Sequence, residues 1–521
     1  MADINTSVLA INGNNLILQD AAIRGSIADT YSASSTYAVG DMVLKDGQLY
    51  KCNTAISTAE AWTAAHWTAV TVGGELATVK DGLRNRTLYV APSGNDSNDG
   101  SETKPLATIN MALTKGATVV MLSAGTYFQS IDLSLSQTGT VDLKKIDGVV
   151  RFKPTQEQKI ITSETKESGY NKVYSGVLSE TITAGNNWIY QENVADASTL
   201  ITDGERHPLE RGYTNRCAST CIKKCSSANL ADALAEIDNS DEYLWFADGG
   251  KLYFSRPSTV TSTHPISISR GEKLFLNNSP KNTICMNGIR CEFIAINLDK
   301  TRNSEIADCS AGYIFGSGGI TYDDATNTKL IRCEAYRVCN GSTGDGINAH
   351  VTSGSGLLAK RTTGTLLDCW SHDNRDDGFS DHEWCESTII GGLFEYNGKS
   401  GITPSYGSQC TCYSALSRNN YNGFYYTGAS ADTGIGGQLL CVGCASENNT
   451  RGNNQAHAGF LVDSSDGKLI LVNCHTSGNA IGYYVATGST AYISGCTQAD
   501  TQATFGKSRM VINNGTLVAP S

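Results

Sequence analysis

Two short stretches of the chain contain an aspartate and a histidine at the same spacing. "GDGINAH" contains Asp345 and ends at His350, and "DDGFSDHE" repeats the pattern with Asp377 and His382. The two copies lie 32 residues apart (382 − 350). Two neighbouring carboxyl groups can break a glycosidic bond, because one donates a proton while the other activates water or attacks carbon. The two copies form one site only if the chain returns to the same place after one repeat.

The second half of the chain shows the repeats that such a return requires. A glycine followed by an apolar residue recurs at short intervals, which is typical of a solenoid built from short strands and turns. Asparagines stand four residues before three of these glycines, and cysteines recur about once per coil. The glycines are Gly319, Gly346, Gly378, Gly401, Gly423, Gly459 and Gly482, the asparagines are Asn374, Asn397 and Asn419, and the cysteines are Cys309, Cys333, Cys369, Cys412, Cys444, Cys474 and Cys496. We therefore predict an all-β fold, a parallel β-helix.

Equivalent residues of neighbouring coils in a β-helix lie one strand spacing apart, about 4.8 Å. We therefore expect Asp345 to lie against Asp377 and His350 against His382, on the outer face of the helix. Two adjacent aspartates raise the upper pKa of the pair, which provides a protonated acid beside a carboxylate. The alternative is that each aspartate, standing before a glycine, only caps its own turn.

The candidate site residues fall into two groups. The catalytic candidates are Asp345, Asp377, His350, His382 and Glu383. The candidates for substrate binding are Asp373, Arg375, Asp376, Asp381, Trp384, Glu395, Tyr406, Tyr425 and Trp370. Alternation along the strand places Asp381 inward with Phe379, and Arg375 either binds a substrate carboxylate or neutralises Asp373 and Asp376. The histidine column is expected to continue as a polar stripe of Asp323, His350, His382, Ser405, Thr427 and Asp463.

The composition favours a β protein that does not bind nucleic acid. Glycine is frequent at 53 residues and proline rare at 9, which suits short strands and tight turns. The formal net charge of −11 opposes binding to phosphates. We expect neither a signal peptide nor a membrane segment, and therefore folding in a cytoplasm, because no basic and apolar leader and no apolar run of ~18–20 residues is present. The 17 cysteines are expected to be mostly reduced.

The chain divides into an attachment segment at 1–30, a small β module at 31–70, a linker at 71–86, the β-helix at 87–500 with an inserted region at about 186–265, and an end strand or cap at 501–521. The module resembles the small chitin-binding type of carbohydrate-binding module, through Tyr37, Gly40, Asp41, Val43, Asp46, Gly47, Tyr50 and Trp67. The pair Asp46-Gly47 predicts a tight hairpin. The resemblance implies that Tyr31, Tyr37, Trp62 and Trp67 stack on sugar rings. The alternative is that these aromatic residues form the core of the module.

The segment "TLYVAPSGNDSNDGSETKPLATINMAL" and the run at 369–428 resemble the right-handed parallel β-helices of the pectate-lyase-like superfamily and of bacteriophage tailspikes. The resemblance implies a homotrimeric virion protein of a phage tail, a polysaccharide depolymerase. It further implies contact with other tail proteins through the N-terminus and with a bacterial surface polysaccharide through the β-helix. The chain departs from the fuller pattern because it ends soon after the last coil, without an obvious segment to lock a trimer.

Three functions are consistent with these residues. The first is hydrolysis of glycosidic bonds by Asp345 and Asp377, without a cofactor or a metal site. The second is β-elimination on a uronic-acid glycan, in which His350 or His382 accepts a proton and Ca²⁺ neutralises the substrate. The acidic residues that would hold that Ca²⁺ are Asp323, Asp324, Asp373 and Asp376. The third is a spike that binds glycan as a receptor without cutting it.

Overall fold

The structure is a computed structural model of one chain. It describes residues 7–11, 14–18, 28–71, 86–154, 159–161, 163–179, 188–191, 221–240, 244–255, 266–268, 271–339, 344–352, 361–428, 436–450, 457–465, 467–500, 503–505 and 509–513. The chain divides into two compact units, Met1–Asn85 and Arg86–Ser521. Within the described ranges, no helix has the length and apolar character needed to cross a membrane.

The N-terminal unit contains a hairpin and a small sheet. Strands β1 (Ser7–Ile11) and β2 (Asn14–Leu18) pair antiparallel. The four-stranded sheet contains β3 (Asp29–Thr30), β4 (Met42–Lys45), β5 (Gln48–Cys52) and β6 (Trp67–Val70), and the short helix η1 (Ala64–His66) precedes its last strand. Asp46 and Gly47 join β4 to β5 with φ angles of 52° and 76°. The predicted tight hairpin is confirmed, because positive φ at both central residues is typical of this turn.

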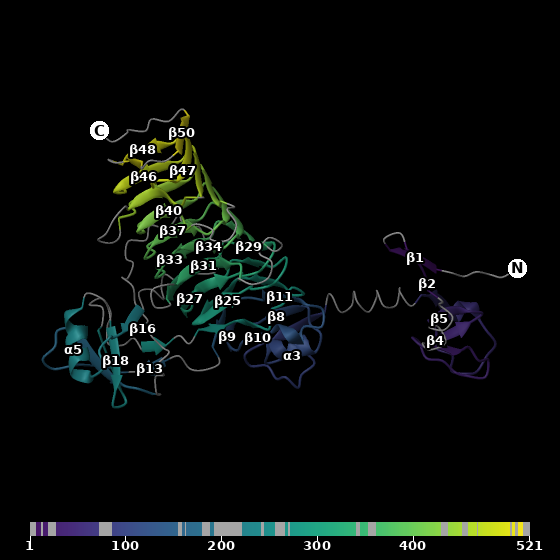
Figure 1. Ribbon diagram of the computed structural model, residues 1–521. Helices are drawn as coiled ribbons and strands as arrows, with labels where there is room; N and C mark the ends of the chain where they lie inside the picture. The colour runs from purple at the N-terminus through teal and green to yellow at the C-terminus, as the bar shows by residue number, and fades with distance from the viewer. Residues whose placement is uncertain are drawn as a thin grey trace. The chain divides into compact units, whose positions relative to one another are not determined.

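The second unit is dominated by a parallel β-helix with three long sheets (Figure 1). Consecutive strands of one coil enter different sheets, and each strand pairs in parallel with its equivalent in the next coil. Strand β31 (Asp345–His350), for example, pairs with β34 (Phe379–His382), which pairs with β37 (Ser400–Pro404). This topology confirms the predicted all-β parallel β-helix.

The first sheet has 13 strands: β7 (Thr87–Val90), β8 (Val119–Leu122), β11 (Thr140–Lys145), β23 (Thr283–Asn287), β26 (Glu305–Ala307), β29 (Thr328–Ile331), β32 (Thr363–Leu367), β35 (Glu386–Ile390), β38 (Gln409–Tyr413), β41 (Gln438–Val442), β44 (Lys468–Val472), β47 (Thr490–Ser494) and β50 (Arg509–Asn513). The second sheet has 11 strands: β9 (Gly125–Phe128), β12 (Val150–Lys153), β24 (Ile289–Glu292), β27 (Ser310–Phe315), β30 (Glu334–Cys339), β33 (Trp370–His372), β36 (Leu393–Glu395), β39 (Leu416–Arg418), β42 (Ala445–Glu447), β45 (His475–Ser477) and β48 (Thr497–Gln498). The third sheet has 10 strands, in which β31, β34 and β37 are joined by β21 (Glu272–Lys273), β25 (Ile294–Asn297), β28 (Gly318–Thr321), β40 (Asn422–Thr427), β43 (Ala458–Asp463), β46 (Ile481–Val485) and β49 (Ala503–Phe505). Smaller elements are the pair β10 (Ile131–Asp132) and β22 (Phe275–Leu276), and the helices α3 (Ile109–Thr114) and η2 (Leu133–Leu135).

A separate sheet of eight strands interrupts the β-helix in the chain between β12 and β21. Its strands are β13 (Lys159–Ile161), β14 (Thr165–Lys166), β15 (Val173–Val177), β16 (Trp188–Gln191), β17 (Cys221–Lys224), β18 (Leu244–Asp248), β19 (Lys251–Ser255) and β20 (Ile266–Ile268), and α5 (Leu230–Asn239) contacts this sheet. The inserted sheet therefore begins at Lys159, earlier than the expected boundary at 186. The physical reason is that β13 and β15 pair with β20 and β19, and so belong to the same sheet as the later strands.

The core of the β-helix consists of inward columns of apolar side chains. In the third sheet, Ile347, Phe379, Ile402 and Phe424 occupy equivalent positions in successive coils, and all four are 0% exposed. Burying such side chains is the main favourable contribution to folding. Because one face of each strand is fixed by this packing, the other face presents a predictable set of outward side chains.

The asparagine ladder extends through five coils. One of its members differs from the residue that the sequence predicted. Asn374, Asn397, Asn420, Asn449 and Asn479 are buried, and each side-chain amide donates to the side-chain oxygen of the next at 2.9, 3.0, 3.1 and 2.9 Å. The prediction of Asn419 is wrong, since that residue takes a left-handed turn conformation with φ of 56°. The turn from Asn420 to Gly423 is one residue shorter than the turn from Asn397 to Gly401, so counting back from the glycine missed the ladder residue.

The cysteine column is confirmed except for Cys412. Cys412 pairs with Cys441 in the first sheet, whereas Ala415 bonds through its main-chain oxygen to the residue after Cys444 and so occupies the expected column. All cysteines whose side chains the structure describes are free thiols, and nearly all are buried. A buried thiol at these positions packs as a small apolar group.

Replacing Asn420 with Ala is expected to lower the free energy of unfolding by about 1–3 kcal/mol for each buried polar group that loses its partner. The Asn420 side chain accepts from the main-chain N–H of Asn397 and donates to the carbonyl of Phe394. Asn419→Gly is the matched control, and it is expected to be nearly neutral because glycine adopts a positive φ without strain. Thermal and chemical unfolding measure both variants, and equal losses would contradict the ladder assignment.

Candidate active site

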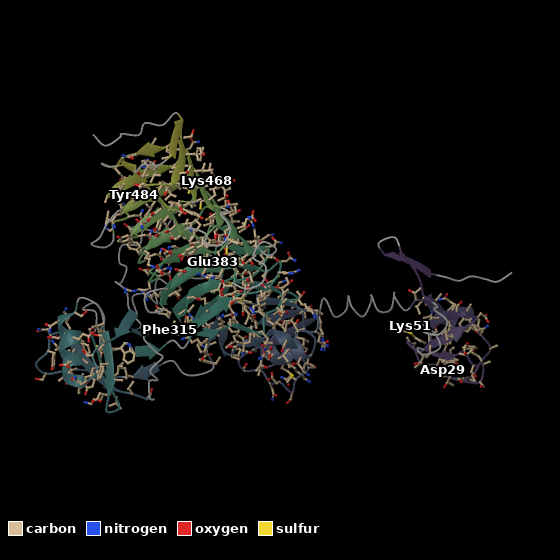
Figure 2. All side chains as sticks on the ribbon, viewed as in Figure 1. Asp29, Lys51, Phe315, Glu383, Lys468 and Tyr484 are labelled. Carbon is tan, nitrogen blue, oxygen red and sulfur yellow. The ribbon has the colours of Figure 1, made fainter. Side chains whose placement is uncertain are left out.

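Strands β31, β34 and β37 bring the two aspartate–histidine copies side by side. The register pairs Ile347 with Phe379 and His350 with His382, which is the stacking that the repeat predicted. Ile347 and Phe379 are fully buried, while His350 keeps 37% of its side chain exposed. Figure 2 labels Glu383, the residue after His382, on the β-helix at the level of these strands. The repeat in the sequence therefore becomes one place in the structure.

Asp345, Asp376 and Asp377 form a group of three carboxylates where these strands begin, with one oxygen of each within 4.8 Å of the others. All three side chains are buried, since the residues are only 6%, 5% and 7% exposed. The expectation that Asp345 and Asp377 lie on the exposed outer face is therefore wrong. The reason is that both stand at the corner where the chain enters its strand, and their carboxylates turn onto the backbone of the next coil.

Two of these aspartates hold the neighbouring coil in place. Oδ1 of Asp345 accepts from the main-chain N–H of Asp377 at 3.0 Å, and Oδ1 of Asp377 accepts from the main-chain N–H of Ser400 at 2.7 Å. The side-chain amide of Asn348 donates to Oδ2 of Asp345 at 2.9 Å. Both of these backbone bonds reach the next coil, so they differ from the alternative in which each aspartate caps its own turn. Oδ1 of Asp377 is occupied by the bond to Ser400. Any proton transfer at Asp377 would therefore use the other oxygen, Oδ2.

Lys399 is the charged neighbour that makes the pKa of Asp376 differ from those of Asp345 and Asp377. Its ammonium lies 2.7 Å from Oδ1 and 2.8 Å from Oδ2 of Asp376, while 58% of its side chain stays exposed. Burial raises the pKa of Asp376, and the bond to Lys399 opposes that shift. Burial, followed by the charge of Asp376, raises the pKa of Asp345 to about 7. Burial and the charges of Asp345 and Asp376 raise the pKa of Asp377 well above its usual range, so Asp377 keeps its proton to a higher pH than an ordinary aspartate does.

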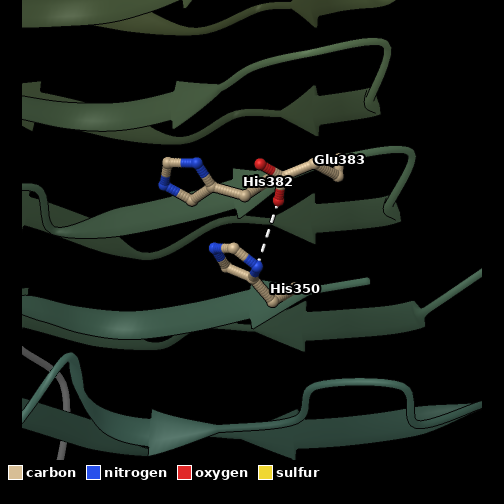
Figure 3. Close-up of side chains that lie close together, drawn as sticks. All are labelled: His350, His382 and Glu383. Carbon is tan, nitrogen blue, oxygen red and sulfur yellow. Dashed lines mark ion pairs between the residues drawn. The ribbon is translucent and has the colours of Figure 1, made fainter. Parts of the chain in front are cut away.

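His350, His382 and Glu383 form a second group at the other end of the same strands (Figure 3). Nδ1 of His350 lies 3.0 Å from Oε2 of Glu383, and the two imidazole rings stack with centroids 4.8 Å apart. His382 bonds Ser380 through Nε2 at 2.7 Å and Ser405 through Nδ1 at 3.1 Å. Burial lowers the pKa of His382 to about 4, helped by the charge of His350, so this ring is neutral at neutral pH.

Three residues expected to bind substrate lie instead on or directly after strands of the second sheet. The ring N–H of Trp370 donates to Oε1 of Glu395 at 3.1 Å, and a carboxylate oxygen of Asp373 lies 2.7 Å from Nδ1 of His372. Trp370, Asp373 and Glu395 therefore lie at the second sheet, whereas Asp377 precedes β34 of the third, and a role of the three in substrate binding stays a prediction. The chain turns a corner between β33 and β34, where Asp373 has a φ of 54°, and alternation along a strand does not continue through such a corner.

The remaining candidates divide by exposure. Asp381 faces the interior, as alternation predicted, and Oδ1 accepts from the hydroxyl of Ser387. Asp381 is 0% exposed and cannot touch a polymer on the surface, whereas Trp384 keeps 8% of its surface exposed. Tyr406 is 42% exposed with its ring centroid 6.2 Å from that of His382, and Tyr425 is half-buried on the third sheet. These two tyrosines stay candidates for contact with substrate.

Lys399 is the residue of this site that the sequence analysis missed. It precedes Ser400, the residue whose N–H bonds Asp377, so extending the register by one more coil would have placed it beside the aspartates. Arg375 is exposed. Its positive charge opposes the rise in the pKa of Asp376, although less than Lys399 does. This favours the neutralising role of Arg375 over binding of a substrate carboxylate.

In the N-terminal unit, Tyr31, Tyr37, Trp62 and Trp67 pack against one another. The rings of Trp62 and Trp67 stack with centroids 5.2 Å apart, and Tyr31 contacts both edge-on at 5.0 and 5.6 Å. Trp67 is buried and the other three are half-buried. These rings form the core of the small unit, and stacking of their remaining faces on sugar stays a prediction.

Comparison with known proteins gives two short sequence matches. The family model described as "Protein of unknown function (DUF1565)" matches residues 92–133. The protein YwoF of Bacillus subtilis (strain 168), described as uncharacterized, is 43% identical over 53 residues, which is 10% of this chain and 11% of that protein. Each match covers only a small part of this chain.

Solved structures with a similar chain course have low sequence identity. XylC in complex with xylose is 11% identical, with 79% of this chain and 70% of that chain covered and a TM-score of 0.42. The tailspike protein gp49 from Pseudomonas phage LKA1 is 12% identical, with 78% and 71% covered and a TM-score of 0.30. Pectate lyase Pel9A is 11% identical, with 84% and 80% covered and a TM-score of 0.35.

Asp377→Asn is expected to stabilise the protein increasingly as the pH rises. The raised folded-state pKa means that the folded protein keeps this proton after the unfolded chain, with an Asp pKa of about 3.9, has lost it. The wild-type protein therefore loses stability from about pH 4 up to the folded pKa. Asparagine has no charge to bury and keeps an oxygen for the N–H of Ser400. Thermal unfolding over a pH series measures the difference between the two melting temperatures.

Glu447→Gln, at a half-buried position on the second sheet, is the control for a change of charge alone. Its melting temperature is expected to follow that of the wild-type protein over the same pH series. A difference for Asp377→Asn that stays constant or shrinks as the pH rises would show that this carboxyl ionises as readily in the folded protein as in the unfolded chain.

Proposed function

We propose that the chain is a polysaccharide-degrading enzyme, a glycoside hydrolase that cleaves a bacterial surface glycan at the aspartate group of the third sheet. The observation that supports it is the cluster of Asp345, Asp376 and Asp377 within 4.8 Å, of which only Asp376 has a lysine ion pair in the described part of the chain. Neighbouring carboxyls whose environments push their pKa values apart are what acid–base cleavage of a glycosidic bond requires.

The roles of the three aspartates follow from their neighbours. Asp377, held protonated by burial and by the two other carboxylates, donates a proton to the leaving glycosidic oxygen. Asp376, whose charge is balanced by Lys399, is the carboxylate that activates water or attacks carbon. Asp345 adds the charge that raises the pKa of Asp377 and holds its main-chain N–H. The reacting pair is then Asp376 and Asp377, and Asp345 positions them.

The exposed side chains at the other end of the same strands would contact the polymer. His350 and Glu383 expose 37% and 36% of their side chains, and Tyr406 is 42% exposed. The imidazoles can orient hydroxyl groups of the glycan, and the tyrosine ring offers a face for a sugar. The pair His350–Glu383 thus fits a role in substrate binding.

The wider setting is part of the same proposal. The resemblance of the segment at 87–113 and of the run at 369–428 to phage tailspikes supports a homotrimeric virion protein. Such a protein meets other tail proteins through its N-terminus and the bacterial surface glycan through the β-helix. The aromatic cluster of the N-terminal unit would add a second contact with carbohydrate.

A second candidate function is β-elimination of a uronic-acid glycan, favoured by the lysine among three carboxylates. The four aspartates expected to hold Ca²⁺ do not come together, since Asp373 bonds His372 on the second sheet. Among the described residues, the aspartates close enough to share one ion are Asp345, Asp376 and Asp377. Oxygen ligands of this kind suit Ca²⁺. The ammonium of Lys399, which pairs with Asp376, would neutralise the substrate carboxylate, and His350 would accept the proton.

Asp377→Asn is expected to lower the release of reducing ends by about 100-fold or more, the contribution typical of a general acid. A panel of bacterial capsule and cell-wall glycans is incubated with the wild-type protein to find the substrate, and the variant is then compared on it. Glu447→Gln is the matched control and should retain the wild-type rate. Binding of glycan by the wild-type protein without any product would favour the receptor-binding spike over an enzyme.

The products are expected to lack the ultraviolet absorbance of unsaturated sugars, because hydrolysis adds water across the broken bond whereas elimination leaves a double bond. The same digest is measured for reducing ends and for this absorbance. Absorbance that rises with cleavage, and that disappears when Ca²⁺ is removed, would establish the lyase in place of the hydrolase.

A further inference from the structure

His350, His382 and Glu383 supply two imidazoles and a carboxylate from two neighbouring coils. His350 ends β31, whereas His382 ends β34 and Glu383 follows it, and Figure 3 shows the carboxylate of Glu383 directed at the ring of His350. One donor atom from each residue lies within 4.8 Å of the other two. All three residues are half-buried, so the group is anchored in the helix and open to solvent.

The spacing of these donors is close to that around a bound transition metal ion. Zinc binds histidine nitrogen and carboxylate oxygen at about 2.0–2.2 Å, which places the donors of a tetrahedral centre about 3.4 Å apart. Nδ1 of His350 and Oε2 of Glu383 are already 3.0 Å apart. The remaining atoms need shifts on the order of 1 Å, which side-chain rotation provides.

The surrounding chain holds the donors in place. Glu383 and Trp384 have φ angles of 47° and 62°, a left-handed conformation that is unfavourable for residues with a Cβ and that reverses the chain at the end of β34. Ser405 bonds Nδ1 of His382 at 3.1 Å and Ser380 bonds Nε2 at 2.7 Å, so an ion at Nε2 would replace the bond to Ser380. A metal-binding histidine commonly keeps its second ring nitrogen bonded to an oxygen in this way, which fixes the orientation of the ring.

We propose that His350, His382 and Glu383 bind a divalent transition metal ion such as Zn²⁺. Imidazole donors favour zinc and its neighbours over Ca²⁺ and Mg²⁺, which take oxygen ligands. Three protein ligands leave a fourth position for water or substrate, the arrangement typical of zinc sites in enzymes. The donor set differs in chemistry from the all-oxygen aspartate group at the other end of the same strands.

An ion at this place would offer its open position to a hydroxyl or carboxylate oxygen of the polymer. This role rests on the proposed function, whereas binding of the ion rests on the donor geometry alone. The experiment therefore measures binding and cleavage separately.

The full-length protein, stripped with a chelator, is titrated with Zn²⁺ by calorimetry and with Co²⁺ by visible absorption. One saturable site is expected, with the absorption of cobalt held by nitrogen and oxygen and without a thiolate charge-transfer band. Glu383→Gln and His382→Ala should each abolish this site. Ser405→Ala should weaken it by about 10–100-fold, the usual effect of removing the partner of a metal-binding histidine.

His475→Ala is the matched control, because His475 bonds Thr497 and belongs to no such donor group in the described part of the chain. It should bind the ions as the wild-type protein does, and circular dichroism checks that each variant is folded. No saturable site in the wild-type protein, or an unchanged site in the double variant Glu383→Gln/His382→Ala, would overturn the proposal. If the ion binds but no glycan is cleaved, the metal site is supported and the proposed function is contradicted. If glycan is cleaved but no ion binds, the proposed function is supported and the metal site is contradicted.

Discussion

Parallel pairing between successive coils is the constraint on which every other feature of the β-helix depends. The backbone hydrogen bonds of β31, β34 and β37 hold equivalent residues one strand spacing apart, about 4.8 Å. Inside, this spacing stacks Ile347 on Phe379 and produces a continuous apolar column. Outside, it brings together side chains that lie 32 residues apart in the chain, such as His350 and His382 (382 − 350). A shift of one residue in this register would exchange the inward and outward faces of the strands. It would separate the residues of the aspartate group and those of the histidine group.

The asparagine ladder and the aspartate group are both buried, but they differ in charge. The asparagines satisfy one another and the turn backbone without any charge. Asp345, Asp376 and Asp377 are equally buried but ionisable, and a single ammonium, that of Lys399, balances one of them. The pKa of Asp345 rises from 3.8 to about 7, which corresponds to a few kcal/mol of folding free energy forgone at high pH. Ionisable groups with such shifts are candidates for a functional site.

The sequence was sufficient for the fold and for the register of β31 with β34, because the glycine and apolar pattern fixes which residues face inward. It failed wherever the chain turns a corner. Asp373 has a left-handed conformation just after β33, so its side chain belongs to the second sheet although it stands only four residues before Asp377. Counting back from the glycine predicts Asn419 in place of Asn420, because turn lengths differ by one residue between coils. Lys399 was missed because only repeated residue types were followed, and its role depends on charge at an unrepeated position.

The positions of the aspartate group and of the histidine group also limit how a polymer could lie on this surface. Asp377 and His382 are separated by five residues, about 16 Å at the rise of an extended strand. Neighbouring coils, in contrast, are about 4.8 Å apart. A glycan that runs along the helix axis would meet the aspartates or the histidines but not both. A glycan that runs along β34 would pass Lys399 and the aspartates at one end and His350, Glu383 and the exposed ring of Tyr406 at the other. Because the exposed side chains gather at the histidine end and the buried acids at the other, the second orientation joins binding to cleavage on one strand, and the proposed function requires it.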